Sequence, residues 1–192
     1  MGVAVRRKRR KRNSGLEDAD VASHTVDLAD FWQRERPDLD HTELLLQIYV
    51  MRLGRMIDDA YDRMCRKTYG ISGGEMRVLF ALRRAGPPFA RRPTDLFRAL
   101  LVTSGAITKQ VDRLQTAGLV VRLPDPSSGR GFLIQLTDKG RAAADETVEV
   151  LAKRSLISWA TKGLSRRELE VALGFCKRLL MALEQGATAE QS

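Results

Sequence analysis

The chain has little cysteine and little histidine, and it lacks any long apolar run. Its two cysteines, Cys65 and Cys176, imply no disulfide framework, and their scarcity fits a reducing compartment. Its two histidines, His24 and His41, are isolated, so no metal site is expected. No apolar run approaches the roughly 20 residues that a membrane-spanning helix needs. We therefore expect a cytoplasmic protein that binds neither a metal nor a membrane.

The motifs of common enzyme classes are also absent from the sequence. There is no nucleophile elbow, no phosphate-binding glycine loop, no paired acid–base constellation and no cluster of cysteine and histidine. We therefore expect no catalytic residue, no cofactor and no enzymatic activity.

Positive charge is abundant, but it is concentrated in one run. The formal net charge is +9, and residues 6–12 carry seven positive charges, so the rest of the chain carries +2. A DNA-binding function must therefore depend on local basic patches, with the run as an additional electrostatic arm. No apolar segment follows the run, which argues against a secretory signal. Residues 1–25 have too few apolar groups to offset ordering entropy, and we expect a disordered basic tail.

Helical patterns occupy both sides of the centre. A short helix is predicted over about 26–35, and a long one over about 40–68 has one apolar face, formed by Leu53, Met56, Ile57, Ala60, Tyr61 and Met64. Ser72 and Glu75 form a capping box for a helix to about Arg84. Thr137 is predicted to cap a helix to about Thr161, and Ser165 with Glu168 to open a last helix to about Glu184.

The last helix carries a second apolar stripe, formed by Leu169, Ala172, Leu173, Cys176, Leu180 and Leu183. One small domain cannot bury such long stripes alone, so pairing with a second copy is the economical solution. We therefore predict a homodimer in which residues 26–70 and 142–186 supply the dimerisation helices, while residues 187–192 form a disordered tail. Both cysteines follow or lie on these stripes, and buried packing is their expected role.

Residues 71–141 have the order of a winged helix-turn-helix. Thr94 is predicted to cap one short helix, and Thr103 or Ser104 the next, which ends near Gly118 and turns Ile107, Val111 and Leu114 inward. Residues 119–123 and 132–136 read as strands, and 124–131 as a projecting loop. The predicted fold is mainly α with a small β-hairpin wing, which places one helix in a DNA major groove.

The motifs of this region also carry a family resemblance. They are Arg-Pro-Thr-Asp-Leu at 92–96, Thr-Ser-Gly at 103–105, Asp-Arg-Leu at 112–114, Ala-Gly-Leu-Val at 117–120, Pro-Asp-Pro at 124–126 and Leu-Thr-x-x-Gly-Arg at 136–141. In this combination the chain resembles the MarR family of bacterial transcription regulators over residues 26–185. The resemblance implies a homodimer that binds a palindromic operator, and often release of DNA by a small aromatic or phenolic ligand.

The residues that we expect to contact DNA are small, hydroxyl-bearing or basic, so they allow close approach to base edges and phosphates. They are Thr94, Thr103, Ser104, Gly105, Thr108, Lys109, Arg113 and Arg130. Arg130 stands at the wing tip, where a guanidinium can enter a narrow minor groove. The family's usual tip is Asp-Arg-Arg, and here Ser-Gly-Arg at 128–130 replaces it.

A narrower resemblance is to the urate-responsive subgroup, through Asp-Phe-Trp at 30–32 and the segment 83–88. In that subgroup a tryptophan, an aspartate and two arginines serve the ligand response. Trp32 and Arg122 match, whereas Arg77 replaces the aspartate and Gln110 replaces the recognition-helix arginine. If the pocket persists, Arg77 suits an anionic ligand such as an aromatic carboxylate. The alternatives are a helix-packing Trp32, a solvent-exposed Arg77 and an ion-paired Arg122.

Two other functions remain open at this point. A nucleoid-type protein would coat DNA with little sequence preference through its basic tail. A thiol-based sensor would release DNA on oxidation of Cys65 or Cys176. The main prediction is a repressor that dissociates from its operator on ligand binding and that is associated with the nucleoid when bound to DNA.

Overall fold

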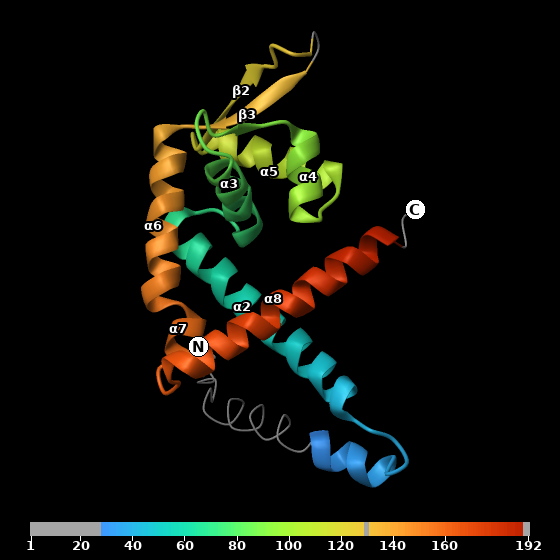
Figure 1. Cartoon of the computed structure of the whole chain (residues 1–192). Helices are drawn as coiled ribbons and strands as arrows, with labels where there is room; N and C mark the ends of the chain where they lie inside the picture. The colour runs from blue at the N-terminus through green and yellow to red at the C-terminus, as the bar shows by residue number, and fades with distance from the viewer. Residues whose placement is uncertain (1–27, 129–130, 190–192) are drawn as a thin grey trace, which may run out of the picture. The chain divides into compact units, whose positions relative to one another are not determined.

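The structure is a computed structural model that describes residues 28–128 and 131–189 (Figure 1). The predicted basic tail at 1–25 and Arg130 lie outside these residues. The chain divides into two compact units, residues 1–55 and 56–192, and the division falls inside helix α2 (Thr42–Tyr69). The first unit contains a helix over 28–35, close to the prediction, and the amino-terminal half of α2.

The second unit begins with the carboxyl-terminal half of α2 and contains the winged helix-turn-helix. Its further elements are α3 (Gly73–Arg84), β1 (Ala90–Arg91), α4 (Pro93–Leu100), α5 (Ser104–Thr116), β2 (Val120–Pro124), β3 (Phe132–Leu136), α6 (Asp138–Arg154), α7 (Leu156–Ala160) and α8 (Arg166–Ala189). The prediction of a mainly helical fold with a small β-hairpin wing is confirmed. No helix in the described part of the chain combines the length and hydropathy needed to span a bilayer.

The sheet has three antiparallel strands in the order β1-β3-β2. The wing hairpin pairs β2 with β3 from Val120 opposite Leu136 to Pro124 opposite Phe132. The sequence analysis missed β1, which pairs Ala90 with Gln135 on the other edge of β3. A strand of two residues is too short to show the alternation by which strands are recognised.

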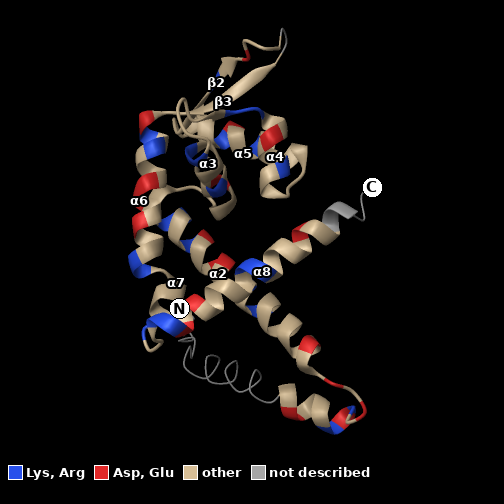
Figure 2. Cartoon of the chain, in the orientation of Figure 1, with Lys and Arg blue, Asp and Glu red and all other residues tan. Residues whose placement is uncertain are grey.

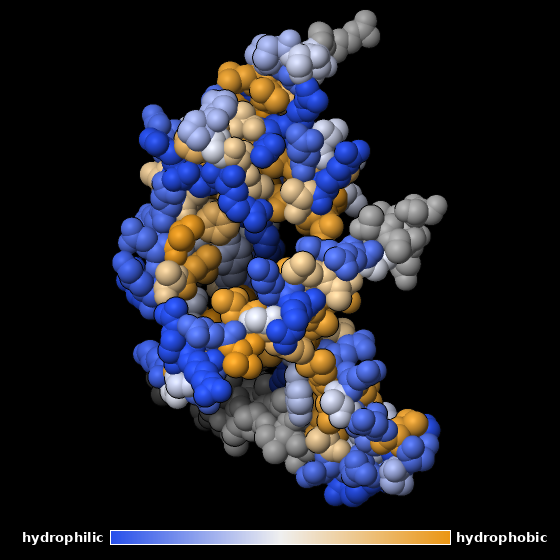
Figure 3. Space-filling model, viewed as in Figure 1, coloured by the Kyte–Doolittle hydropathy of each residue, from blue (hydrophilic) through white to orange (hydrophobic). Residues whose placement is uncertain are grey.

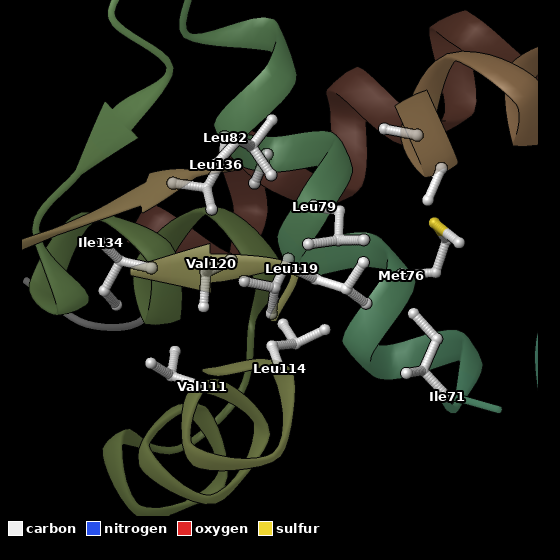
Figure 4. Close-up of a cluster of buried hydrophobic side chains, with 14 of the residues drawn as sticks. Ile71, Met76, Leu79, Leu82, Val111, Leu114, Leu119, Val120, Ile134 and Leu136 are labelled. Atoms are coloured by element: carbon white, nitrogen blue, oxygen red, sulfur yellow. The ribbon is translucent and has the colours of Figure 1, made fainter. Parts of the chain in front are cut away.

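The core of the second unit lies between α3, α5 and the wing strands. Figure 4 shows its labelled side chains converging from these elements: Ile71, Met76, Leu79, Leu82, Val111, Leu114, Leu119, Val120, Ile134 and Leu136. The three α5 residues predicted to face inward, Ile107, Val111 and Leu114, are all buried. Burial of these side chains fixes the rotation of α5, so its opposite face must point to solvent.

The start of α6 fixes the carboxyl end of α5. Thr137 caps α6 by accepting a hydrogen bond from the Gly140 N–H at 3.0 Å, and its hydroxyl donates to the Gly118 carbonyl at 2.8 Å. A Cβ on Gly140 would lie only 2.0 Å from the Leu119 carbonyl oxygen, so only glycine permits this approach. The Leu-Thr-x-x-Gly motif therefore holds the carboxyl end of α5 against the start of α6.

Two predicted helix features are wrong. Thr94 does not cap α4: Arg92 is the N-cap residue, and Pro93 begins the helix because its fixed φ and missing N–H suit the first position. The helix predicted from Thr137 to about Thr161 breaks at Ser155, which is extended. Ser155 instead accepts a hydrogen bond from the Ser158 N–H at 3.0 Å and caps α7.

The predictions for the terminal helices are confirmed in part. Both capping boxes are present, Ser72 with Glu75 and Ser165 with Glu168. However, α8 continues to Ala189, into the stretch expected to be a disordered tail. Cys65 is buried as expected, but Cys176 is exposed, on a helix whose residues Leu173, Leu180 and Leu183 are also largely in solvent.

Candidate nucleic-acid interface

Helix α5 presents a polar and basic face to solvent, and Figure 2 shows basic residues on α5 and on the segment that leads into α4. Thr103 caps α5 by accepting a hydrogen bond from the Ala106 N–H at 3.2 Å. The next residues on this face, Ser104, Gly105, Thr108 and Lys109, are all exposed. The positive end of the helix dipole, three hydroxyl groups and a lysine therefore lie on one face. Such a face can contact DNA phosphates and base edges.

Arg113 lies at the edge of this face and has a protein partner. Its Nε is 3.1 Å from Oε1 of Glu75, whose carboxylate is buried at the start of α3. The other Glu75 oxygen accepts the Ser72 N–H at 2.7 Å. The Glu75 contact thus holds Arg113 Nε, while the side chain remains 66% exposed and its outer N–H groups can still meet a phosphate.

Thr94 is exposed in the first turn of α4, although it is not the cap. Its hydroxyl therefore remains able to contact a phosphate at the entrance to the helix-turn-helix. The turn between α4 and α5 begins at Leu101, which is left-handed at φ 53°.

The base of the wing is held by a contact that the sequence analysis missed. Arg92 Nε donates to Asp125 Oδ2 at 2.6 Å, and the Asp125 carboxylate also accepts from the Ser127 N–H and hydroxyl. The Arg92 guanidinium and the two Ser127 donors lower the pKa of Asp125 to about 2. Both residues belong to motifs quoted from the sequence, but nothing in the sequence indicates that they pair.

Arg122 and Gln110, two of the predicted ligand residues, contact the protein itself. Arg122 on β2 forms an ion pair with Asp112 Oδ1 at 2.5 Å, a hydrogen bond with Gln115 and a contact over the Phe132 ring. Gln110 is half-buried, and its amide lies against Gly74, so that a Cβ there would meet its Nε2 at 2.8 Å. The contacts of Arg122 are therefore those of the ion-paired alternative. Gln110 packs α5 against the start of α3.

Arg77 borders a cavity of about 380 Å³ on α3. The cavity is lined by Arg77, Phe80, Arg83, Arg84, Leu100 and Val148. Arg77 pairs with Asp58 and lies over the Tyr61 ring at 5.3 Å. Arg83 pairs with Asp145 at 2.7 Å. Arg84, which the sequence analysis did not single out, forms no ion pair among the described residues and is exposed.

Trp32 belongs to the first unit, where its ring meets Phe31 edge to face at 5.4 Å between centroids. Its backbone carbonyl accepts from the Arg36 N–H. Both contacts are local to its own helix, so the ligand role of Trp32 stays a prediction.

The two cysteines differ in environment. Cys65 is fully buried beside Tyr61, and burial raises its thiol pKa to about 11. Cys176 lies exposed on α8. A buried thiol with a raised pKa holds little of the thiolate that reacts with oxidants.

Comparison with known proteins agrees with this arrangement. Residues 69–131 match the sequence profile of the MarR family. The chain is 37% identical over 123 residues to the transcriptional regulator PecS of Dickeya dadantii, covering 64% of this chain and 74% of PecS. It is 33% identical over 132 residues to the multiple antibiotic resistance protein MarR of Escherichia coli K12, covering 67% and 89%.

Solved structures extend the match to a DNA complex. The crystal structure of a cysteine-to-serine mutant of E. coli MarR with operator DNA superposes with a TM-score of 0.57 at 29% identity, over 73% of this chain and 97% of that chain. The reduced form of the same protein gives 0.61 at 30% identity, over 70% and 96%. Sequence profile, relatives and fold coincide on the region that carries the exposed face of α5, and the chain belongs to the MarR family of DNA-binding transcription regulators.

Proposed function

We propose that this chain represses transcription as a homodimer that binds a palindromic operator through α5 and the wing. The observation that carries the proposal is the exposed polar face of α5, which is fixed in rotation by three buried apolar side chains. The DNA complex of a relative supports the same use of the fold. A repressor of this kind acts in the cytoplasm and is associated with the nucleoid when bound to DNA.

The homodimer is supported by apolar side chains that the chain leaves in solvent. Leu173, Leu180 and Leu183 of α8 are 70%, 57% and 62% exposed, and Figure 3 shows apolar side chains at the surface. Exposed apolar stripes on long helices are unfavourable in water and are buried when a second copy pairs with them. Two copies then present two α5 helices to two half-sites.

The ligand that we propose is a small aromatic anion in the α3 cavity. Phe80, Leu100 and Val148 offer apolar walls, and Arg84 offers a guanidinium that forms no ion pair with the described part of the chain. Guanidinium binds carboxylate in bidentate geometry, which extends the sequence hypothesis from Arg77 to Arg84. Urate is a weaker candidate, because Arg77 and Gln110 replace two residues of the subgroup's quartet and Arg122 is paired with Asp112. Coupling is reciprocal, so the ligand weakens operator binding by the factor by which DNA weakens ligand binding.

The first experiment selects duplexes from a random DNA pool with the full chain and compares the selected duplex with a shuffled one. At about 0.15 M salt we expect a preference of roughly a thousandfold or more. Equal affinity for both duplexes would overturn the proposal in favour of a DNA-coating protein. Deletion of residues 1–13 should weaken binding to both duplexes alike, because the basic run contacts phosphates without reading sequence.

The ligand is tested separately by calorimetric titration with benzoate and with urate. We expect benzoate to bind and Arg84→Ala to abolish that binding. Arg98→Ala removes the same charge from a part of α4 that does not line the cavity and should leave binding unchanged. Tight urate binding without benzoate binding would defeat the carboxylate assignment.

We do not favour the thiol-sensor alternative. Cys65 is buried with a raised pKa, so only the exposed Cys176 could serve as its thiol.

A further inference from the structure

One charged side chain of the wing is almost completely removed from water. The Asp125 side chain is only 4% exposed, and it lies 2.6 Å from the Arg92 guanidinium, which is itself half in solvent. Burying a carboxylate is costly unless its charge and its lone pairs are satisfied. A buried acid in a DNA-binding region, where its charge opposes the phosphates, requires an explanation other than affinity for DNA.

The contacts of Asp125 satisfy both of its oxygens. Oδ2 accepts from Arg92, and Oδ1 accepts from the Ser127 N–H at 3.0 Å and hydroxyl at 2.8 Å. The Asp125 backbone closes the same turn, because its N–H donates to the Gly131 carbonyl and its carbonyl accepts from the Ser128 N–H. The loop that leaves β2 is thus folded around this carboxylate.

The other end of the contact is the residue from which α4 begins. Arg92 is the N-cap of α4 but makes no side-chain capping hydrogen bond, so its guanidinium is free to reach the wing. Its neighbours are fixed on both sides, since Arg91 pairs with Ile134 in the sheet and Pro93 is the first helical residue. The pair therefore connects the wing loop directly to the helix-turn-helix.

We propose that the Arg92–Asp125 pair fixes the wing relative to α4 and α5, and that Arg92 is a positioning residue for DNA binding rather than a phosphate ligand. This inference rests on the proposed DNA-binding function. It assigns the wing a fixed direction, so that wing and recognition helix meet one duplex without first paying the entropy of ordering the loop. The negative charge of Asp125 repels DNA phosphates, but it favours DNA binding by holding the wing in place through Arg92.

The two roles predict opposite signs for one substitution. Asp125→Asn removes a negative charge, and electrostatics alone predicts tighter binding to a polyanion. The positioning role predicts weaker binding, by about tenfold, because an amide has one acceptor oxygen and no charge, and cannot accept from both Arg92 and the Ser127 N–H. Asp138→Asn removes the same charge from a side chain that is 98% exposed, and we expect it to bind DNA as the wild type does or slightly more tightly.

The experiment measures the dissociation constant of the full chain for the duplex that it selects from a random pool, over a series of salt concentrations. Arg92→Ala, Asp125→Asn and the double variant Arg92→Ala/Asp125→Asn should each lose a similar amount of affinity, because all three break the same Arg92–Asp125 contact. The dependence of log affinity on log salt should be unchanged in Asp125→Asn. Arg92 Nη2 also donates to the Ser127 hydroxyl. Arg92→Lys should therefore recover only part of the loss, because an ammonium cannot hold both Asp125 and Ser127.

Tighter binding by Asp125→Asn would overturn the inference, as would a loss in Arg92→Ala alone accompanied by a salt slope reduced by about one, the signature of a phosphate contact. Thermal unfolding of each variant, together with titration of its active fraction, separates loss of the wing geometry from loss of the fold. If the wild type selects no duplex, the proposed function itself fails, and that outcome is distinct from a failure of the pair.

Discussion

Helices α5 and α8 have the same kind of amphipathic sequence but opposite environments. In α5 the apolar residues Ile107, Val111 and Leu114 are at most 1% exposed, and the polar face is in solvent. In α8 the stripe residues Leu173, Leu180 and Leu183 are each more than half exposed. The apolar side chains of α5 are buried within the second unit, whereas these three leucines of α8 lie largely in solvent.

The difference separates two functions of the molecule. Each fully buried leucine contributes about 1.5–3 kcal/mol relative to an exposed one, so α5 is fixed by the fold of a single chain. The exposed leucines of α8 would gain a comparable contribution only in the proposed dimer, where a second copy covers them. In the proposed dimer, each chain therefore builds its own DNA-binding face, whereas the spacing of the two α5 helices depends on the pairing of two copies.

The largest effect on DNA affinity is expected from substitutions that disrupt the proposed dimer interface on α8. Leu173→Glu with Leu180→Glu places two charges in the proposed dimer interface, where their burial without partners is prohibitive. We expect a monomer in sedimentation velocity and a loss of at least about a hundredfold in affinity for the selected duplex, because one half-site is lost. Gln185→Glu adds a charge on the opposite face of α8 and should leave the dimer intact. A dimeric double variant would mean that α8 does not form the interface.

The α5 side is tested by deleting a buried side chain. Leu114→Ala should lower the free energy of unfolding by about 2–5 kcal/mol, because it leaves a cavity in the core beside α3. Leu183→Ala in α8 is the matched control, and in the monomeric background its cost should be below about 0.5 kcal/mol, the range of surface substitutions. Equal costs in urea denaturation would show that α8 is packed in the single chain after all.

Local sequence predicted much of this contrast. The capping boxes at Ser72 and Ser165 need only residues three apart, and the inward stripe of α5 needs only helical periodicity. These signals lie within one or two turns, so the chain alone specifies them. The predictions of a winged helix-turn-helix and of its buried α5 stripe succeeded for this reason.

The features that failed depend on distant or competing contacts. Ser155 can stand inside a helix or cap a new one, and only the packing of α6 and α7 decides between these. The Arg92–Asp125 contact joins residues 33 positions apart, and whether Cys176 is buried depends on what packs against α8, not on the helical periodicity of its sequence. A local sequence pattern encodes neither a contact between residues far apart in the chain nor what packs against a helix.

A smaller effect is expected from the exposed face of α5. Lys109→Ala should weaken binding to selected and shuffled duplexes by a similar factor, about three- to tenfold, and should reduce the salt slope by about one. Thr108→Ala removes no charge from the same face, and its loss should be confined to the selected duplex. If Lys109→Ala changed only the selected duplex, Lys109 would be a base-reading residue and not a phosphate contact.

The smallest effect concerns the thiols of the two regions. Burial raises the pKa of Cys65 from about 9 to about 11, so the folded state retains this proton where the unfolded chain releases it. The stabilisation is complete below about pH 9 and is lost as the pH rises toward 11, so stability must fall across that range. Burial also raises the pKa of Tyr61, which acts in the same direction, so only the difference between variants is informative. Cys65→Ala should make the fall in urea midpoint between pH 9 and 11 shallower, whereas Cys176→Ser, at an exposed position of α8, should reproduce the wild-type slope. Equal slopes in all three proteins would contradict a buried, protonated Cys65.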